Sequence, residues 1–308
     1  MPEKIVEVEN LVKRYKDVTA VDGISFDIHE GEIFSLVGPN GAGKTTTVEM
    51  LECLRTPTSG NAEVLGHNIY DEEMEIKKRI GVMPQDFSGF ERLTVKENVE
   101  LIAKIYNVEP ETKEVLEELG VWGERDRQFQ ELSGGMQRRV GICMALISDP
   151  ELLFLDEPTT GLDPYARRET WDVIQTLKEL GKTVLLTSHY MDEVEQLSDR
   201  VGLLLEGKLV ATDTVHDLIS QYGGGIIVRV KGGGTEEAKK LLLTFTDEIS
   251  DERSTVTGRF KTREEASKAL TELYQLGDGH KIEILESGMD EVFAQIAGGK
   301  VNERGEFV

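Results

Sequence analysis

Gly38-Pro39-Asn40-Gly41-Ala42-Gly43-Lys44-Thr45 is the stretch that decides how this chain folds. Its spacing, G-x-x-x-x-G-K-[ST], is typical of a loop that joins a strand to a helix and binds phosphate groups. The glycines let backbone N–H groups wrap around the phosphates, and the helix N-terminus adds its dipole. Lys44 adds a full positive charge, and the hydroxyl of Thr45 can ligate Mg²⁺. The stretch therefore predicts nucleoside triphosphate binding.

The flanking sequence supplies the context that this loop requires. The apolar segment Glu32–Val37 predicts a strand before it, and Lys44–Leu54 predicts a helix after it. Thr46, in the first turn of that helix, is a further candidate contact to the nucleotide. The loop alone does not distinguish a kinase from a GTPase or a motor.

A second segment ends in two carboxylates. Leu152-Leu153-Phe154-Leu155 is continuous and apolar, as expected of a parallel strand covered on both faces, and Asp156-Glu157 follows it directly. Side chains at the end of such a strand project toward the phosphate loop in α/β proteins. Because neighbouring residues of a strand face opposite sides, two roles are plausible. Asp156 is expected to hold Mg²⁺, and Glu157 to orient and deprotonate the attacking water.

A third segment, Leu132-Ser133-Gly134-Gly135-Met136-Gln137, precedes a helix expected to run from Gln137 to Leu146. Ser133 is a candidate N-cap, and the two glycines expose N–H groups at a helix start, which makes a second anion site. One ATP needs both phosphate-binding elements only if they come from different molecules.

These segments together resemble the nucleotide-binding subunits of ABC transporters, and the similarity covers residues 4–220. Leu132–Gln137 resembles the family signature, Gly38–Thr45 its Walker A motif and Leu152–Glu157 its Walker B motif. The resemblance implies roles for two more residues. Gln85 stands at the Q-loop position, which contacts Mg²⁺ and the attacking water, and His189 at the switch position, which bonds the γ-phosphate.

The resemblance also extends the nucleotide site and its partners. Tyr15 is expected to stack on adenine with Val21 beside it, and Asp163 to help join two subunits. Phe87, Phe90 and Leu93 are expected to face a membrane partner. The expected contacts to ATP and Mg²⁺, beyond the catalytic Glu157, His189 and Gln85, are Tyr15, Val21, Gly38, Pro39, Asn40, Gly41, Ala42, Gly43, Lys44, Thr45, Thr46, Ser133, Gly134, Gly135, Gln137, Asp156 and Asp163.

The implied machine is a head-to-tail dimer, formed with a second copy or a sister subunit. ATP would lie between Gly38–Thr45 of one subunit and Ser133–Gly135 of the other, and closure would exclude water. The permease through which transport occurs would be a separate, multi-span membrane protein.

Composition bounds the remaining possibilities. The chain has 308 residues and a formal net charge of −23, and a surface this acidic repels nucleic-acid phosphates and anionic lipids. Its two cysteines, Cys53 and Cys143, fit packing roles in a reducing compartment. We expect no signal peptide and no membrane span. The expected location is cytoplasmic, at the inner face of the cell membrane through the permease.

The expected fold is α/β: a P-loop NTPase core of the ABC ATPase type over residues 1–221, with a helical signature subdomain at about 87–148. A glycine run, Tyr222–Gly225, then breaks the pattern. A small α+β accessory domain is expected over 222–308. Its helices are expected at Thr235–Leu243, Thr262–Tyr274 and Met289–Ile296, and its strands at Ile226–Val230, Arg259–Lys261 and Ile282–Leu285.

The tail Glu286–Phe293 resembles the ending of drug, lipid or polysaccharide exporter subunits, which favours export. An importer subunit and a soluble or regulatory ABC ATPase remain as alternatives. The transported substrate, the role of the C-terminal domain and the choice between homodimer and heterodimer are not encoded in a pattern we can interpret.

Overall fold

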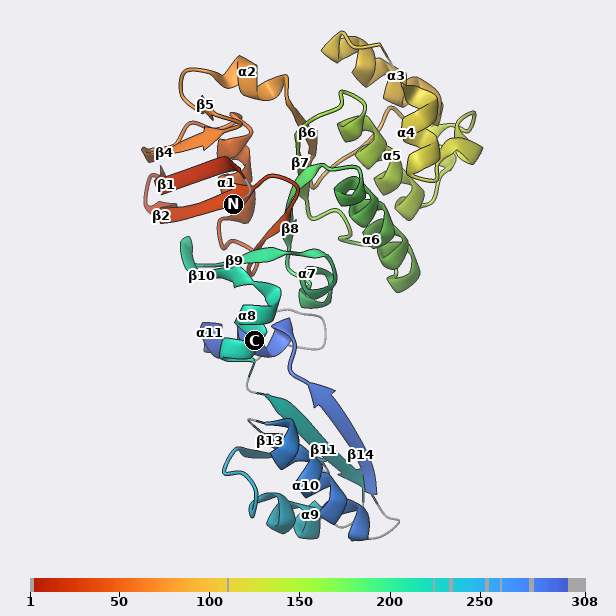
Figure 1. The fold of residues 1–308 in the computed structure, drawn as a ribbon. Coiled ribbons are helices and arrows are strands. Elements are labelled where there is room, and N and C mark those ends of the chain that lie inside the picture. Colours follow the sequence, from red (N-terminus) through yellow and green to blue (C-terminus); the bar gives the residue numbers. More distant parts are fainter. Residues whose placement is uncertain are drawn as a thin grey trace. The chain divides into compact units, whose positions relative to one another are not determined.

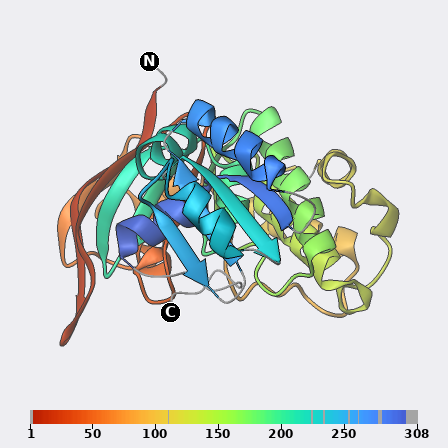
Figure 2. The same ribbon diagram turned by 90° about the horizontal axis from the view of Figure 1, so that it is seen from below.

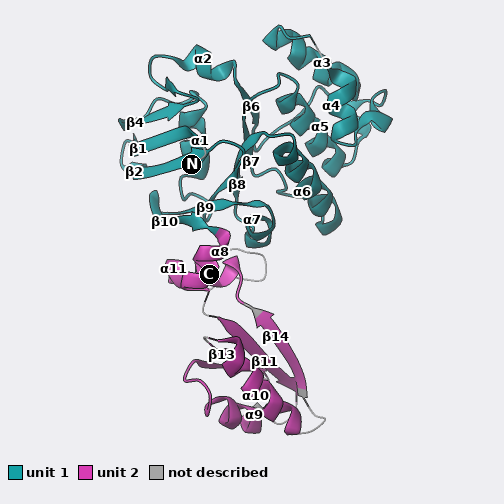
Figure 3. Cartoon of the chain, viewed as in Figure 1, with its two compact units in different colours: residues 1–214 teal, residues 215–308 magenta. Residues whose placement is uncertain are grey.

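The structure is a computed structural model that describes residues 3–109, 111–223, 225–232, 235–252, 255–260, 262–276 and 280–298. The chain divides into two compact units, Met1–Thr214 and Val215–Val308 (Figure 3). Among the described residues, no helix has the length and apolar character needed to cross a membrane.

The first unit is built on a six-stranded sheet in the order β10-β9-β3-β8-β7-β6. Pairing is parallel from β9 to β6, and only β10 runs antiparallel to its neighbour. Every residue of β3, β7 and β8 is buried, which explains their continuous apolar sequences. The strands are β3 (Ile33–Val37), β6 (Ile80–Met83), β7 (Leu152–Asp156), β8 (Thr183–Ser188), β9 (Arg200–Leu205) and β10 (Lys208–Thr214).

A second, antiparallel sheet has the order β2-β1-β4-β5 and lies on one side of the central strands, opposite α5 and α6 (Figure 1). Its strands are β1 (Lys4–Tyr15), β2 (Val18–His29), β4 (Ser59–Val64) and β5 (His67–Asn68). Within the long pair β1 and β2, only Ile5–Val8 and Ile24–Ile28 show in the sequence the alternation that predicts a strand. The β1–β2 register shifts at several points, which interrupts the alternation that marks a strand.

Helices cover both faces of the central sheet. Neighbouring residues of β7 enter different cores: Leu152 and Phe154 pack with the antiparallel sheet, and Leu153 and Leu155 with the helical side. The helices are α1 (Lys44–Leu51), α2 (Glu73–Lys77), α3 (Val95–Tyr106), α4 (Thr112–Glu118), α5 (Gly134–Leu146), α6 (Pro164–Glu179) and α7 (Met191–Leu197), with short 3₁₀ turns η1 (Trp122–Glu124) and η2 (Phe129–Glu131).

Local interactions fix the end of α1 and the start of α3. The helix after the phosphate loop ends at Leu51 rather than Leu54, because Glu52 caps it and Cys53 adopts a left-handed conformation with φ 56°. Thr94 is the N-cap of α3, and its hydroxyl and the Glu97 carboxylate form a capping box.

The second unit contains a four-stranded antiparallel sheet in the order β12-β13-β11-β14, with α9 and α10 packed together on one shared core (Figure 2). This βαββαβ arrangement is the ferredoxin-like motif and confirms an α+β fold. The elements are α8 (Val215–Tyr222), β11 (Ile226–Gly232), α9 (Thr235–Leu242), β12 (Ile249–Glu252), β13 (Thr255–Phe260), α10 (Arg263–Gln275), β14 (His280–Glu286) and α11 (Met289–Ala297).

The division between the units falls before α8, earlier than the boundary expected at 221/222. The reason is tertiary: α8 packs against α11, which comes from the end of the chain. Lys261, which the sequence placed at a strand end, lies outside the described residues.

Candidate active site

The phosphate loop connects β3 to α1 and depends on two of its glycines. A Cβ on Gly38 would lie 2.1 Å from the carbonyl oxygen of Leu204, so no side chain fits there. Gly43 has φ 105°, and a Cβ on it would lie 2.4 Å from the carbonyl oxygen of Ala20. Close backbone approach from β2 and β9 therefore fixes the loop.

Lys44 begins α1 and is almost fully buried. Its Nζ donates to the carbonyl oxygens of Gly38 at 2.8 Å and Pro39 at 3.3 Å, and lies 3.4 Å from Glu157 Oε1. Burial lowers the pKa of Lys44, while the nearby carboxylates of Glu157 and Asp156 oppose that effect. The ammonium group is thus held inside the loop by oxygens of its own chain.

Asp156 is the last residue of β7. The hydroxyl of Thr187, on β8, donates to its Oδ1, and the hydroxyl of Thr45 also interacts with it. Burial raises the pKa of Asp156, although both hydroxyls act in the opposite direction. The carboxylate lies where the strand ends meet the loop.

Glu157 adopts a left-handed backbone conformation with φ 48°, which is uncommon outside glycine. Its N–H donates to Thr187 Oγ1 at 2.9 Å, and this bond holds the strained residue in place. A strained backbone conformation of this kind persists only where the surrounding structure holds it in place, and such residues cluster at functional sites. It turns the Glu157 side chain toward Lys44.

Several groups converge on the Glu157 carboxylate. Gln85 Nε2 donates to Oε2 at 3.3 Å and Thr160 Oγ1 donates to it at 3.0 Å. His189 Nδ1 lies 3.2 Å from the same oxygen, but its orientation does not meet the geometry of a regular hydrogen bond. Burial alone would raise the pKa of Glu157, but His189, Lys44 and Thr160 outweigh it and lower the pKa to about 2. The carboxylate is therefore ionised at neutral pH.

The structure thus brings five of the predicted residues together: Lys44, Gln85, Asp156, Glu157 and His189. They come from the ends of β6, β7 and β8 and the start of α1. Three contributors were missed by the sequence reasoning: Thr160, Thr187 and Arg138. Arg138 Nη1 donates to the carbonyl oxygen of Gln85 at 2.9 Å and so ties the Gln85 loop to α5.

The remaining predicted residues lie elsewhere. Ser133 caps α5, its Oγ accepting from Met136 N at 3.4 Å, and both Ser133 and Gly134 are exposed. Gly135 is buried, and a side chain would be crowded there because a Cβ would lie 2.9 Å from Ala166 Cβ. Within the part of the chain that the structure describes, no hydrogen bond joins the Ser133 side chain to the phosphate loop.

Gln137 and Asp163 use their side chains locally. Gln137 Nε2 donates to the carbonyl oxygen of Phe129 at 3.2 Å. Asp163 caps α6, and its Oδ1 accepts from the backbone N–H groups of Tyr165 and Ala166 at 2.9 and 3.0 Å.

Tyr15 ends β1 with 37% of its surface exposed, and Val21 is fully buried beneath Gly43. The side chains of Lys13 and Arg55 approach the Tyr15 ring, with Lys13 Nζ at 5.2 Å from its centroid. The ring is accessible for stacking.

The residues also suit Mg²⁺. Among the described residues no three or more His, Cys, Asp or Glu side chains are grouped to hold a metal by themselves. Magnesium is usually held by one or two carboxylates together with substrate phosphates. Asp156 and the Thr45 hydroxyl offer that kind of oxygen set, so the donors fit a metal that arrives with the nucleotide.

A strand–loop–helix phosphate cradle facing a paired carboxylate, a glutamine and a histidine defines a P-loop ATPase. Comparison with known proteins places it more narrowly. The ABC transporter family matches residues 21–160. The daunorubicin/doxorubicin resistance ATP-binding protein DrrA of Streptomyces peucetius is 34% identical over 98% of this chain and 95% of its own length. The chain therefore belongs to the ABC transporter family, as one of its ATP-binding, ATP-hydrolysing proteins.

Other relatives and solved structures agree. The Nod factor export ATP-binding protein I of Ralstonia nicotianae is 37% identical over 80% of this chain and 78% of its own length. An ATP-binding cassette of an ABC transporter in its ADP conformation matches with a TM-score of 0.65 and 26% identity, covering 71% of this chain and 94% of that chain. A dimeric cassette in a post-hydrolysis state, bound to ADP and Pi, matches with a TM-score of 0.61 and 28% identity, covering 68% and 98%.

Proposed function

We propose that this chain hydrolyses MgATP at a site shared with a second copy or a sister subunit, and that it thereby powers export through a separate membrane permease. The observation that carries the proposal is the Glu157 carboxylate, which lies within 3.4 Å of Lys44, Gln85 and His189 at the mouth of the phosphate loop.

The same contacts suggest how the base is activated. The γ-phosphate competes with Glu157 for Lys44 and His189. When these two groups turn to the phosphate, the pKa of Glu157 rises from about 2, and the carboxylate becomes a stronger base for the attacking water. Gln85 orients that water. Asp156 and Thr45 would hold Mg²⁺, which would neutralise charge on the phosphates.

Pairing completes the site. The start of α5 in the second subunit, where Ser133 and Gly134 are exposed and Gly135 follows, presents backbone N–H groups to the γ-phosphate, with Gln137 supporting that helix start. Asp163 lies at the start of α6, where it joins the two subunits. The dimeric cassette bound to ADP and Pi supports this arrangement by analogy.

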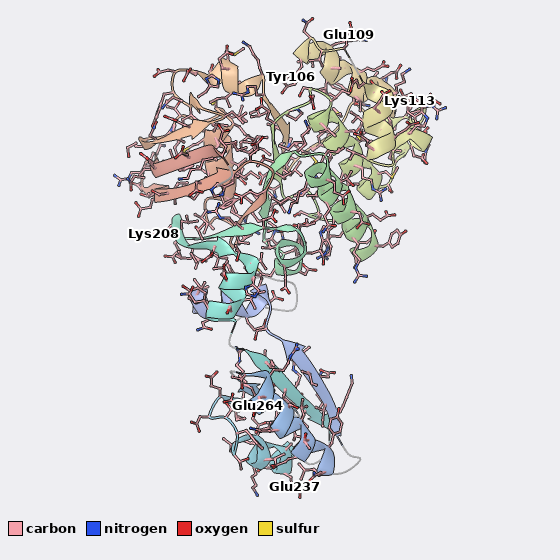
Figure 4. All side chains as sticks on the ribbon, in the orientation of Figure 1. Tyr106, Glu109, Lys113, Lys208, Glu237 and Glu264 are labelled. Carbon is pink, nitrogen blue, oxygen red and sulfur yellow. The ribbon has the colours of Figure 1, made fainter. Side chains whose placement is uncertain are left out.

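An apolar groove at Ile80 and Val82 of β6 is the proposed docking site for a helix of the permease. Its volume is about 430 Å³. Its floor is β6, which leads directly to Gln85, so movement of a docked helix would reach the site. Tyr106 forms part of its wall at the end of α3 (Figure 4). The apolar lining residues are Leu54, Met74, Ile80, Val82, Ile105 and Tyr106.

Of the three residues expected to face the permease, Phe90 and Leu93 are available for contact, whereas Phe87 packs in the core. Phe90 is 55% exposed, and Asn98 holds its loop by accepting from Phe90 N at 2.8 Å. Phe87 instead packs edge-on against Phe129, with ring centroids 5.9 Å apart, and belongs largely to the core. Phe90 and Leu93 therefore remain the proposed contacts.

Export is supported by relatives named for drug resistance and for Nod factor export. The protein would then sit at the inner face of the cell membrane through its permease. The C-terminal unit, residues 215–308, would act as an accessory domain.

The test uses the tagged full-length chain in its native host. It should co-purify in detergent with a multi-span membrane protein and release phosphate from ATP only with Mg²⁺. Ile105→Glu, at a position 66% exposed in the groove, should abolish co-purification and leave the basal rate intact. Leu243→Glu, at an exposed apolar position in the second unit, is the matched control. Equal co-purification of both variants would refute the docking site.

A further inference from the structure

Glu193 is a fully buried carboxyl group that the proposed mechanism does not use. It lies in the first turn of α7, four residues after His189, and none of its surface is exposed. A buried carboxyl group is costly unless its oxygens are bonded, so its partners indicate what it is for.

The partners of the Glu193 carboxyl group come from three other segments. Glu193 Oε1 accepts from Thr159 Oγ1 at 2.7 Å and from Trp171 Nε1 at 3.0 Å. The hydroxyl of Ser188, next to His189, also interacts with the carboxyl group. Oε2 makes no regular hydrogen bond to any residue that the structure describes. Burial raises the pKa of Glu193, which favours the neutral acid.

Each partner lies on a segment that also carries a residue of the proposed mechanism. Thr159 lies two residues after Glu157, in the loop that also contains Thr160. Trp171 lies on α6, the helix that Asp163 caps. Glu193 itself lies in the first turn of the helix that follows His189. One carboxyl group therefore joins the segments that present the base, the switch histidine and the subunit contact.

Thr159 is 1% exposed, so this link is internal and shielded from water. A second link between α6 and α7 lies at the surface: Arg167 Nη1 is 3.2 Å from Asp192 Oδ2, and the Asp192 side chain is 59% exposed. Exposed ion pairs contribute little, whereas buried hydrogen bonds fix geometry. The adjacent residues 192 and 193 thus offer a matched comparison.

We propose that Glu193 is a positioning residue for hydrolysis. Through Thr159 and Trp171 it keeps the Glu157 loop, α6 and the His189 segment in fixed relative positions, so that base and histidine reach the γ-phosphate together. Glu193 touches neither nucleotide nor water itself. The inference rests on the roles proposed for Glu157 and His189.

The test separates turnover from binding in the full-length chain. Glu193→Ala should lower kcat about 10- to 100-fold, the cost of a misplaced catalytic group, while ATP affinity stays close to wild type. Glu193→Gln, which still accepts from Thr159 and Trp171, should restore kcat to within a few-fold of wild type. Asp192→Asn should leave kcat and affinity unchanged.

Thr159→Val is the second variant, and it carries the test if Glu193→Ala does not fold. It removes one hydrogen bond at nearly constant shape and should lower kcat with unchanged ATP affinity. Wild-type kcat in folded Glu193→Ala or in Thr159→Val would overturn the proposal. So would parallel loss of affinity and turnover, or a Glu193→Gln variant as slow as Glu193→Ala.

The roles proposed for Glu157 and for Glu193 can be refuted separately. If Glu157→Gln is inactive and Glu193→Ala is fully active, only the positioning role is wrong. If Glu157→Gln itself hydrolyses ATP normally, the proposed site chemistry is wrong.

Discussion

Two helices of the first unit, α1 and α5, have glycine at or just before their first residue and offer backbone N–H groups to an anion, but their surroundings differ. At the start of α1, Lys44 is 5% exposed and bonded to carbonyl oxygens of its own loop. At the start of α5, Ser133 and Gly134 are exposed, and the Ser133 hydroxyl caps only its own helix. One anion site is enclosed by its own chain, and the other is open to a partner.

The comparison explains why a single chain holds two such sites. The enclosed site has its carboxylates, glutamine and histidine within one subunit. The open one is exposed at Ser133 and Gly134, and in the proposed dimer it would contribute to catalysis at the phosphate loop of the other molecule. The variants below test the two sites in order of expected effect.

The largest effect is expected at the enclosed site from Glu157→Gln. The amide cannot accept a proton from water, so kcat should fall about 10²- to 10⁴-fold. ATP binding should persist, and gel filtration with MgATP should reveal a stable dimer. Glu151→Gln, which alters an exposed carboxylate just before the same strand, should hydrolyse ATP like wild type. A normal rate for Glu157→Gln would contradict the role given to Glu157.

Lys44→Ala is expected to weaken nucleotide binding itself. Hydrogen bonds to charged groups contribute about 1.5–3 kcal/mol, so the ATP dissociation constant should rise about 10- to 100-fold. Titration with a fluorescent ATP analogue measures this change. Lys113→Ala, on α4, serves as the control. Unchanged affinity in Lys44→Ala would remove the loop from the nucleotide site.

Sequence reasoning found the enclosed site because its motifs are local. The phosphate loop and the carboxylate pair each lie within a few consecutive residues, and so does the capped helix start of the open site. Thr187, Arg138 and Glu193 carry no such signal, because each acquires its role only when separate segments pack together. For the same reason the sequence placed α8 in the first unit, whereas packing on α11 assigns it to the second.

The far end of α1 gives a pH test of how enclosed this region is. Burial, helped by Asp156 and Glu49, raises the pKa of Glu52 to about 8. Because the folded state favours the protonated acid, this stabilisation is complete below the unfolded pKa and is lost as pH rises through about 8. Glu52→Gln should therefore gain stability relative to wild type at pH 9, on the order of 5 kcal/mol, and little at pH 4. The free energies of unfolding of wild type and Glu52→Gln are measured by denaturant melts across this pH range. If both change with pH in the same way, Glu52 is not buried as a neutral acid.

The smallest effect is expected at the edge of the site, from Tyr15→Ala. Aromatic stacking contributes about 0.5–1.5 kcal/mol, so ATP affinity should fall only a few-fold while kcat at saturating ATP is unchanged. Isothermal titration calorimetry resolves this difference. Tyr274→Ala, an exposed tyrosine of the second unit, should bind ATP like wild type. Identical affinities for both variants would remove Tyr15 from the adenine contact.

The relation between the enclosed and the open site is tested most directly by mixing two defective chains. Ser133→Asp keeps a good N-cap on α5 but places a negative charge against the γ-phosphate, and Ser133→Asn is its neutral control. Lys44→Ala and Ser133→Asp should each be inactive alone. In a head-to-tail dimer of the two, one site combines both defects and the other is intact, so an equal mixture should recover about a quarter of wild-type turnover. A mixture as inactive as its components would contradict a site shared between two chains.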